Sequence, residues 1–287
     1  MQIIDTHLHL LYPDSLTYAW TDNVPILQGT SSIEMYEALV RPAGVCSALM
    51  MEVDVAENQI EAEMDLVGAI IARGDTFVEG MVAACRPEEP ADVFAAFVDR
   101  LAARPHVKGL RRILHQSPDD LSKPESFAAN LNRLVAHDYT FDLCVTAAQL
   151  SSVALPLVTR CPDLTIVLDH CGNPDIAAGA MDPWRDDIRA LAERPNVNCK
   201  ISGIVNHAAP GWKPDDLRPY FEHLVECFGW ERLVWGSDWP VCRLGGDVNA
   251  WLDATLALVA PCSEDEQSAL LSRNALRVYR MDPASLA

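Results

Sequence analysis

Short runs of β-type residues alternate with helical patterns along almost the whole sequence. The runs are rich in Val, Ile, Leu and aromatic residues, and the segments between them repeat apolar residues every three or four positions, as in Phe94, Phe97 and Leu101. This alternation indicates an α/β fold with a parallel sheet, because each helix returns the chain to the edge where the next strand starts. The expected strands are residues 2–6, 45–52, 76–83, 107–114, 140–145, 164–169, 196–202 and 232–237.

The expected helices match the strands in number. They cover residues 32–40, 58–73, 91–104, 126–137, 149–160, 183–193, 215–228 and 249–259. Eight such units in 287 residues predict a single (β/α)₈ TIM-type barrel, a fold of typically about 250 residues. A doubly wound open sheet is the alternative, but no Gly-rich dinucleotide fingerprint follows any expected strand.

No linker rich in Pro, Gly or Ser divides the chain, so we expect one domain over residues 1–287. Segment 11–31, between the first strand and the first helix, is long for its position and contains Tyr12, Tyr18 and Trp20. Long loops at this end of a barrel usually shape the active site, and we expect the segment to lie over it.

The charge balance excludes several classes of function. The chain has 22 basic and 41 acidic residues, a formal net charge of −19, which disfavours nucleic acid and anionic membrane surfaces as partners.

Targeting signals and cysteines indicate a cytoplasmic protein. The start of the sequence lacks the basic and apolar regions of a signal peptide, and the longest uncharged window contains polar residues and a proline, which argues against a membrane span. The nine cysteines include no Cys-x-x-Cys pair and lie in apolar contexts, which is typical of reduced thiols in a cytoplasmic protein.

Polar side chains gather where the expected strands end, the end at which barrel enzymes hold their active sites. The first strand ends in Asp5-Thr6-His7-Leu8-His9, and on an extended strand His7 and His9 point to one face. The apolar sixth strand finishes in Asp169-His170, and the eighth leads into Asp238, with no helix for Asp238 to cap. A structural role for each alone is an alternative.

Taken together, His7, His9, His170 and Asp238 form a plausible mononuclear metal site. Imidazole and carboxylate are ligands for a divalent ion of the zinc type, and a catalytic site leaves one position for water. A carboxylate beside activated water can take its proton, and Asp238 is the predicted base.

Other residues near the strand ends are candidate substrate contacts. Arg111 can hold a carbonyl, carboxylate or hydroxyl group, and Lys200 lies on the polar face of the seventh strand. The remaining candidates are Glu52, His115 and Trp239, for which burial in the core is the alternative.

In these motifs the chain resembles the amidohydrolase superfamily, and within it the branch of sugar-lactone hydrolases. The resemblance spans nearly the whole chain in the same order. It rests on the segments Asp5-Thr6-His7-Leu8-His9, Lys108-Gly109-Leu110-Arg111, Leu168-Asp169-His170-Cys171-Gly172-Asn173-Pro174, Asn198-Cys199-Lys200-Ile201-Ser202-Gly203, Asp182-Pro183-Trp184, Gly236-Ser237-Asp238-Trp239-Pro240 and Asn274-Ala275-Leu276-Arg277-Val278-Tyr279.

The resemblance implies a barrel that opens a sugar lactone, of the L-fucono- or L-rhamnono-lactone type, with water. It implies that His7, His9 and His170 bind metal or polarise the carbonyl, that Asp238 is the general base, and that Arg111 contacts substrate. Some members of this branch hydrolyse lactones without a metal, so the requirement for one stays open. Leu8 and Leu10 depart from the usual residues of the first motif, and Asn173 stands where Lys is frequent, which leaves the exact substrate open.

Two alternatives remain at this stage. A related enzyme that hydrolyses a dicarboxylate lactone or decarboxylates an aromatic acid would need basic residues in its pocket, for which Arg111, Lys200 and Arg243 are available. A non-catalytic barrel would be expected to lack a ligand or the base, yet His7, His9, His170 and Asp238 are all present. The expected partner is a small-molecule sugar lactone, and the alternatives of a monomer and a homo-oligomer both stay open.

Overall fold

The computed structural model describes residues 1–286 and contains one eight-stranded parallel sheet in the order of the sequence. Each strand pairs with the next, and Leu8 forms a parallel bridge to Trp239, just beyond the last strand, so the sheet is a nearly closed barrel. The predicted (β/α)₈ fold is confirmed. The strands are β1 Ile3–Leu8, β2 Val45–Met51, β3 Val78–Ala84, β4 Val107–Ile113, β5 Thr140–Cys144, β6 Ile166–Leu168, β7 Val197–Ile201 and β8 Leu233–Trp235.

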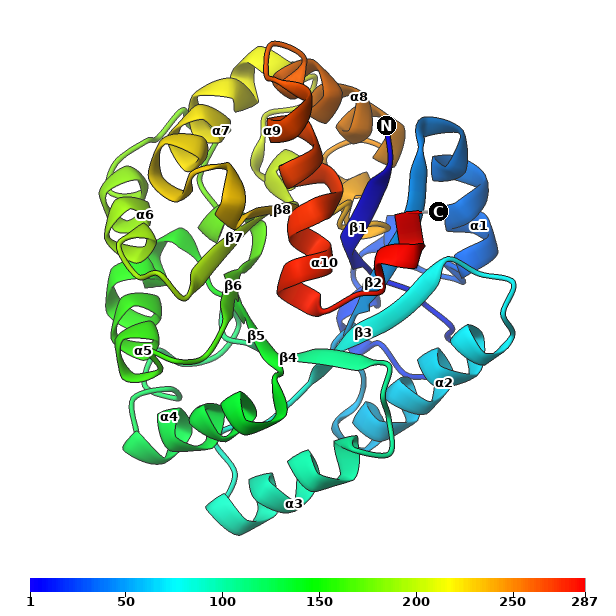
Figure 1. Cartoon of the computed structure of the whole chain (residues 1–287), viewed down its shortest axis with the longest axis vertical. Coiled ribbons are helices and arrows are strands. Elements are labelled where there is room, and N and C mark those ends of the chain that lie inside the picture. The colour runs from blue at the N-terminus through cyan, green and yellow to red at the C-terminus, as the bar shows by residue number, and fades with distance from the viewer. Residues whose placement is uncertain (287) are drawn as a thin grey trace.

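Helices surround the barrel as an outer ring (Figure 1). Local signals fix their starts: the Ser32 side chain accepts the Met35 backbone N–H at α1, and Ser263 and Glu266 form the capping box at α9. The helices are α1 Ile33–Val40, α2 Ile60–Ala72, α3 Ala91–Leu101, α4 Glu125–Asn132, α5 Leu155–Arg160, α6 Trp184–Ala192, α7 Pro214–Phe228, α8 Val248–Val259, α9 Glu264–Ser268 and α10 Asn274–Tyr279.

Two strands are only half as long as the sequence predicts. The apolar pattern predicts strands over residues 164–169 and 232–237, whereas β6 and β8 have three residues each. The chain leaves β6 in a turn where His170 and Cys171 have positive φ, and leaves β8 shortly before Asp238, which also has positive φ. Extended geometry therefore ends where these polar side chains are placed at the mouth of the barrel.

Helix α10, absent from our list of expected helices, lies across the end of the barrel that faces the viewer in Figure 1. Its side chains Ala275, Val278 and Tyr279 form one apolar cluster with inward-facing strand residues such as Ile4 and Val167. A separate, larger cluster fills the space between the strands and the outer helices. Since α10 fills one end of the barrel, access to the interior comes from the carboxyl ends of the strands.

Segment 11–31 is anchored to itself and to the loop after β2. Leu11 and Ser31 exchange two backbone hydrogen bonds at its ends, and the indole N–H of Trp20 donates to the Val53 carbonyl at 2.8 Å. Among residues 1–286, no helix combines the length and apolar character needed to cross a membrane.

Candidate active site and metal centre

His7 near the end of β1 and His9 just after it are held by a buried anchor at the start of their motif. Asp5 accepts hydrogen bonds from the backbone N–H and hydroxyl of Ser237, at 2.8 and 2.5 Å, and from the hydroxyl of Tyr36. Gly236 allows the chain after β8 to pass close to β1, because a Cβ there would lie 2.5 Å from that of His7. These contacts fix the end of β1 against the segment that carries Asp238.

Strained backbone is concentrated around the same point. His170, Cys171, Asn173 and Asp238 have φ values of 53°, 56°, 54° and 57°, in the left-handed region that residues with a Cβ disfavour. Gly203 is also left-handed, and a Cβ there would lie 2.4 Å from Nδ1 of His170. Non-glycine residues persist in such conformations where the surrounding structure enforces them, and they cluster at functional sites.

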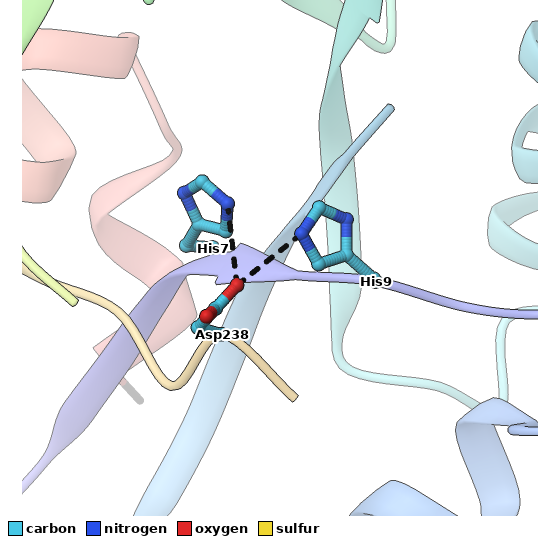
Figure 2. Close-up of side chains that lie close together, drawn as sticks. All are labelled: His7, His9 and Asp238. Atoms are coloured by element: carbon cyan, nitrogen blue, oxygen red, sulfur yellow. Dashed lines mark ion pairs between the residues drawn. The ribbon is translucent and has the colours of Figure 1, made fainter. Parts of the chain in front are cut away.

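Two of the predicted histidines converge on one carboxylate oxygen of Asp238. Oδ1 of Asp238 lies 3.4 Å from Nε2 of His9 and 3.7 Å from Nε2 of His7 (Figure 2). Oδ2 accepts a 2.8 Å hydrogen bond from Nδ2 of Asn206. His170 adjoins the group, with its ring centroid 4.4 Å from that of His7 and its Nδ1 3.0 Å from the Ser202 hydroxyl.

This arrangement fits a bound divalent cation. His9 Nδ1 lies 3.1 Å from the Met51 carbonyl, a pure acceptor, and must donate to it, so Nε2 of the neutral ring is itself an acceptor. Nε2 of His9 and Oδ1 of Asp238 are then two acceptors facing each other, which a cation between them would stabilise. The three donor atoms of His7, His9 and Asp238 lie within 4.8 Å of one another, and two imidazoles with a carboxylate suit zinc.

A second set of ligand atoms, from His7, Asp169 and His170, lies just below the first. Here the chain supplies its own cation: the Lys200 ammonium is 3.1 Å from Oδ1 of Asp169 and 3.4 Å from Nδ1 of His7. Lys200 also donates to Oδ2 of Asp142 at 2.5 Å. In the upper set His7 faces Asp238 through Nε2, on the side of its ring away from Lys200, so this set is the better candidate for a metal ion.

Burial and these charges set the protonation states of the lower residues. Burial, reinforced by the positive charge of Lys200, lowers the pKa of His7 well below its usual value, although Asp169 opposes the shift. Burial alone would raise the pKa of Asp169, but Lys200 and His7 hold it well below its usual range. At neutral pH a neutral imidazole therefore faces an ionised carboxylate and an ammonium group.

Arg111 connects the site to the end of β2. Its Nε donates to Oε1 of Glu52 at 2.6 Å, one Nη donates to the Glu52 carbonyl at 2.8 Å, and the other lies 3.4 Å from Oδ2 of Asp169. Burial alone would lower the pKa of Arg111, but the neighbouring carboxylates raise it. The guanidinium is thus fixed in place with most of its charge compensated.

A cavity of about 410 Å³ opens above these residues, within the range of roughly 300–1,000 Å³ for small-molecule sites. Its polar lining includes His9, Arg111, His115, His170 and Asp238, all of them predicted from sequence. Apolar and aromatic side chains complete the wall, among them Trp20, Val53, Ile113 and Leu244.

Three predicted substrate contacts lie behind the cavity wall instead of in it. Lys200 is 0% exposed and bound to carboxylates, Glu52 is 2% exposed and bound to Arg111, and Trp239 packs on Tyr36 with ring centroids 5.3 Å apart. None of the three lines the cavity among the described residues. The alternation of a strand shows which face a side chain takes, but not how deep in the barrel it lies.

Sequence reasoning missed several residues that the structure brings to the site. Asn206 and His207 follow β7, with His207 Nε2 2.9 Å from Oδ1 of Asn173, and Asp54 follows β2. They lie in irregular segments beyond the strand ends, where no periodicity marks them. Asp169, next to the predicted His170, could have been found from its position at a strand end.

Comparison with known proteins agrees with this geometry. The family model described as amidohydrolase matches residues 4–281. An L-fucono-1,5-lactonase of Burkholderia ambifaria is 37% identical over 220 residues, which cover 72% of this chain and 71% of that protein. An L-rhamnono-gamma-lactonase of Scheffersomyces stipitis is 24% identical over 199 residues, covering 61% of this chain and 59% of that protein.

A solved structure gives the same result for the whole fold. The crystal structure of an amidohydrolase from Burkholderia multivorans with bound zinc superposes with a TM-score of 0.86 at 25% identity, covering 98% of this chain and 100% of that one. Family match, relatives and fold agree, and the chain belongs to the amidohydrolase family, on the branch of the sugar lactonases.

Proposed function

We propose that this protein opens the ring of a sugar lactone with water, giving the corresponding sugar acid. The observation that carries the proposal is the Asp238 carboxylate, held between His7, His9 and Asn206 beside a cavity of small-molecule size. The similarity to an L-fucono-1,5-lactonase makes L-fucono-1,5-lactone the first substrate to test.

In the proposed reaction Asp238 acts as base and then as acid. Its Oδ2 is engaged by Asn206, so in the metal-free site Oδ1 is the atom that takes the proton from water as the water attacks the lactone carbonyl. Arg111 at the cavity wall donates to the carbonyl oxygen as negative charge develops there, through the Nη group whose contact with Asp169 is long at 3.4 Å. Asp238 then returns its proton to the ring oxygen as the C–O bond breaks.

The residues present also suit a divalent metal, and the zinc-bound relative supports this. His7, His9 and Asp238 would hold the ion, with His170 beside them. When bound, such an ion supplies Lewis acidity and lowers the pKa of water. Zinc is our proposal for its identity.

The charge of the cavity favours an uncharged lactone over a dicarboxylate. Among the described residues that line it, Arg111 is the only arginine or lysine, and Glu52 and Asp169 already pair with it. Asp54 and Asp238 add negative charge to the same wall. Arg243, which the sequence offered as a further basic residue, is exposed and is not part of the described lining.

The decisive experiment follows proton release with a pH indicator. The substrates are L-fucono- and L-rhamnono-lactone, with 2-pyrone-4,6-dicarboxylate as the anionic comparison. Each is tested before and after chelation, and again after zinc is added back. Hydrolysis of the sugar lactones is expected, and its loss on chelation with recovery on zinc would support the metal. Activity on the dicarboxylate alone would overturn the proposal.

A further inference from the structure

Asp54 is held in an unusual conformation at the edge of the cavity. Its φ of 49° lies in the left-handed region, which aspartate tolerates better than most residues but still disfavours. Its backbone N–H donates to Oε2 of Glu52 at 2.7 Å, and Glu52 in turn accepts from Arg111 at 2.6 Å. The buried ion pair of Glu52 and Arg111 therefore holds the backbone of Asp54 in place.

The Asp54 carboxylate is available to a ligand. It is half-buried and lines the cavity, and within residues 1–286 no hydrogen bond or ion pair engages its oxygens. Burial, with the nearby charge of Glu52, raises the pKa of Asp54. An ionised carboxylate accepts hydrogen bonds through two oxygens, and bonds from hydroxyl groups to an ionised acceptor are short and strong.

Trp20 belongs to the same part of the wall. Its indole N–H is tied to the carbonyl of Val53, the residue directly before Asp54, at 2.8 Å. A fixed aromatic ring beside a free carboxylate offers two surfaces that a sugar requires: an apolar one for its C–H face, and acceptors for its hydroxyl edge. A lactone without hydroxyl groups would use only the first.

We propose that Asp54 and Trp20 form a subsite that recognises the hydroxylated face of an uncharged lactone, with Asp54 accepting hydrogen bonds from substrate hydroxyls. This inference rests on the proposed lactone hydrolysis and names its substrate class as polyhydroxylated neutral lactones. The negative charge of Asp54 also repels a carboxylate, which disfavours anionic lactones and assists release of the acid product.

The test combines two variants with two substrates. Asp54→Gly removes the carboxylate and tolerates positive φ, while Asp54→Asn keeps the shape and part of the acceptor capacity. The substrates are L-fucono-1,5-lactone and δ-valerolactone, which has a six-membered lactone ring without hydroxyl groups. The matched controls are Asp138→Gly and Asp138→Asn, since Asp138 is an exposed aspartate with a φ of 57° on another part of the chain.

For Asp54→Gly we expect kcat/KM on L-fucono-1,5-lactone to fall about 10- to 100-fold, mainly through KM, because bonds to a charged acceptor are lost. Activity on δ-valerolactone should stay within about twofold, Asp54→Asn should lie between Asp54→Gly and wild type, and both Asp138 variants should match wild type.

Four results would overturn the inference. An equal loss on both lactones would mean that Asp54 only supports the structure, and no loss on L-fucono-1,5-lactone would mean that it does not contact substrate. A wild-type enzyme that opens δ-valerolactone as efficiently as L-fucono-1,5-lactone would show no hydroxyl recognition, while lactone hydrolysis itself would stand. A wild-type protein that opens neither would overturn the proposed function and, with it, this inference.

Discussion

The barrel interior holds buried polar residues at two levels, and the chain satisfies them differently. At the lower level, Lys200 pairs with Asp142 and Asp169 at 2.5 and 3.1 Å, and the Tyr279 hydroxyl donates to Asp142 at 2.7 Å. We call Lys200, Asp142, Asp169 and Tyr279 the lower network. Each buried charge there is paired with an opposite charge or a hydrogen-bond donor, which offsets the cost of removing it from water.

At the upper level, polar groups face each other without a hydrogen-bond donor or cation between them. Nε2 of His9 and Oδ1 of Asp238 face each other as acceptors at 3.4 Å, and His170 and Asp238 have positive φ. We call His7, His9, His170 and Asp238 the mouth cluster. The chain therefore stabilises the lower network by itself, whereas the mouth cluster needs a ligand, metal ion or proton to satisfy its facing acceptors.

The sharpest test of this contrast is Asp238→Asn. Loss of the base should lower kcat by about 10²–10⁴-fold, the usual contribution of general acid–base catalysis. Stability should stay the same or rise, because an amide N–H can donate to His9 where two acceptors now face each other. Steady-state kinetics and urea unfolding check both parts. Activity above a tenth of wild type, or a loss of more than about 2 kcal/mol in unfolding free energy, would contradict the assignment.

The lower network should show the opposite behaviour. Lys200→Met leaves Asp142 buried without a cation and Asp169 with only its longer contact to Arg111, and we expect unfolding free energy to fall by about 3–5 kcal/mol. The double variant Lys200→Met, Asp142→Asn removes one of the stranded charges and should recover part of the loss. Urea unfolding measures both. A single variant within about 1 kcal/mol of wild type would mean that the network contributes little to stability.

The sequence predicts the fold and much of the mouth cluster for the same reason. Parallel strands place their carboxyl ends together, so His7, His9, His170 and Asp238, each at or just beyond a strand end, could be expected to meet. The apolar period marks the strands, and polar residues at their ends mark the site. Neither signal depends on the conformation of the loops.

Depth in the barrel and loop conformation could not be predicted in this way. Asn198 and Lys200 share a face of β7 by alternation, yet only the barrel's geometry puts Lys200 among buried carboxylates. Asp54 is positioned by Glu52, which is itself held by Arg111 from another strand. Asn206 is positioned by Asp238, 32 positions further along the chain. Tyr279 belongs to a recognised motif, but its bond to Asp142, 137 positions away, appears only once α10 closes the barrel.

Tyr279→Phe should reveal how much this distant bond contributes. The change removes only the hydroxyl that donates to Asp142, so we expect a loss of about 1–2 kcal/mol in unfolding free energy, with kcat within a few-fold of wild type. The matched control is Tyr220→Phe, whose hydroxyl donates to the uncharged Ala180 carbonyl at 3.2 Å near the surface and should matter less. Equal losses of stability in the two variants would show that the charge of Asp142 adds nothing to the strength of the Tyr279 hydrogen bond.

The smallest expected effect concerns His115, which lines the cavity beside the mouth cluster. Burial, and then the charge of Arg111, lowers the pKa of His115 to about 4, so the unfolded chain binds this proton more tightly than the folded protein does. Its contribution to stability is therefore complete above about pH 6.5 and is lost as pH falls towards 4. His115→Gln should make the decline in unfolding free energy between pH 6.5 and 4 shallower by about 1 kcal/mol, measured by urea unfolding with chelator present. An identical pH dependence in wild type and variant would show that the cavity does not disfavour a charged ring at this position. Unsatisfied electrostatics would then be confined to the mouth cluster and would not extend to the cavity wall beside it.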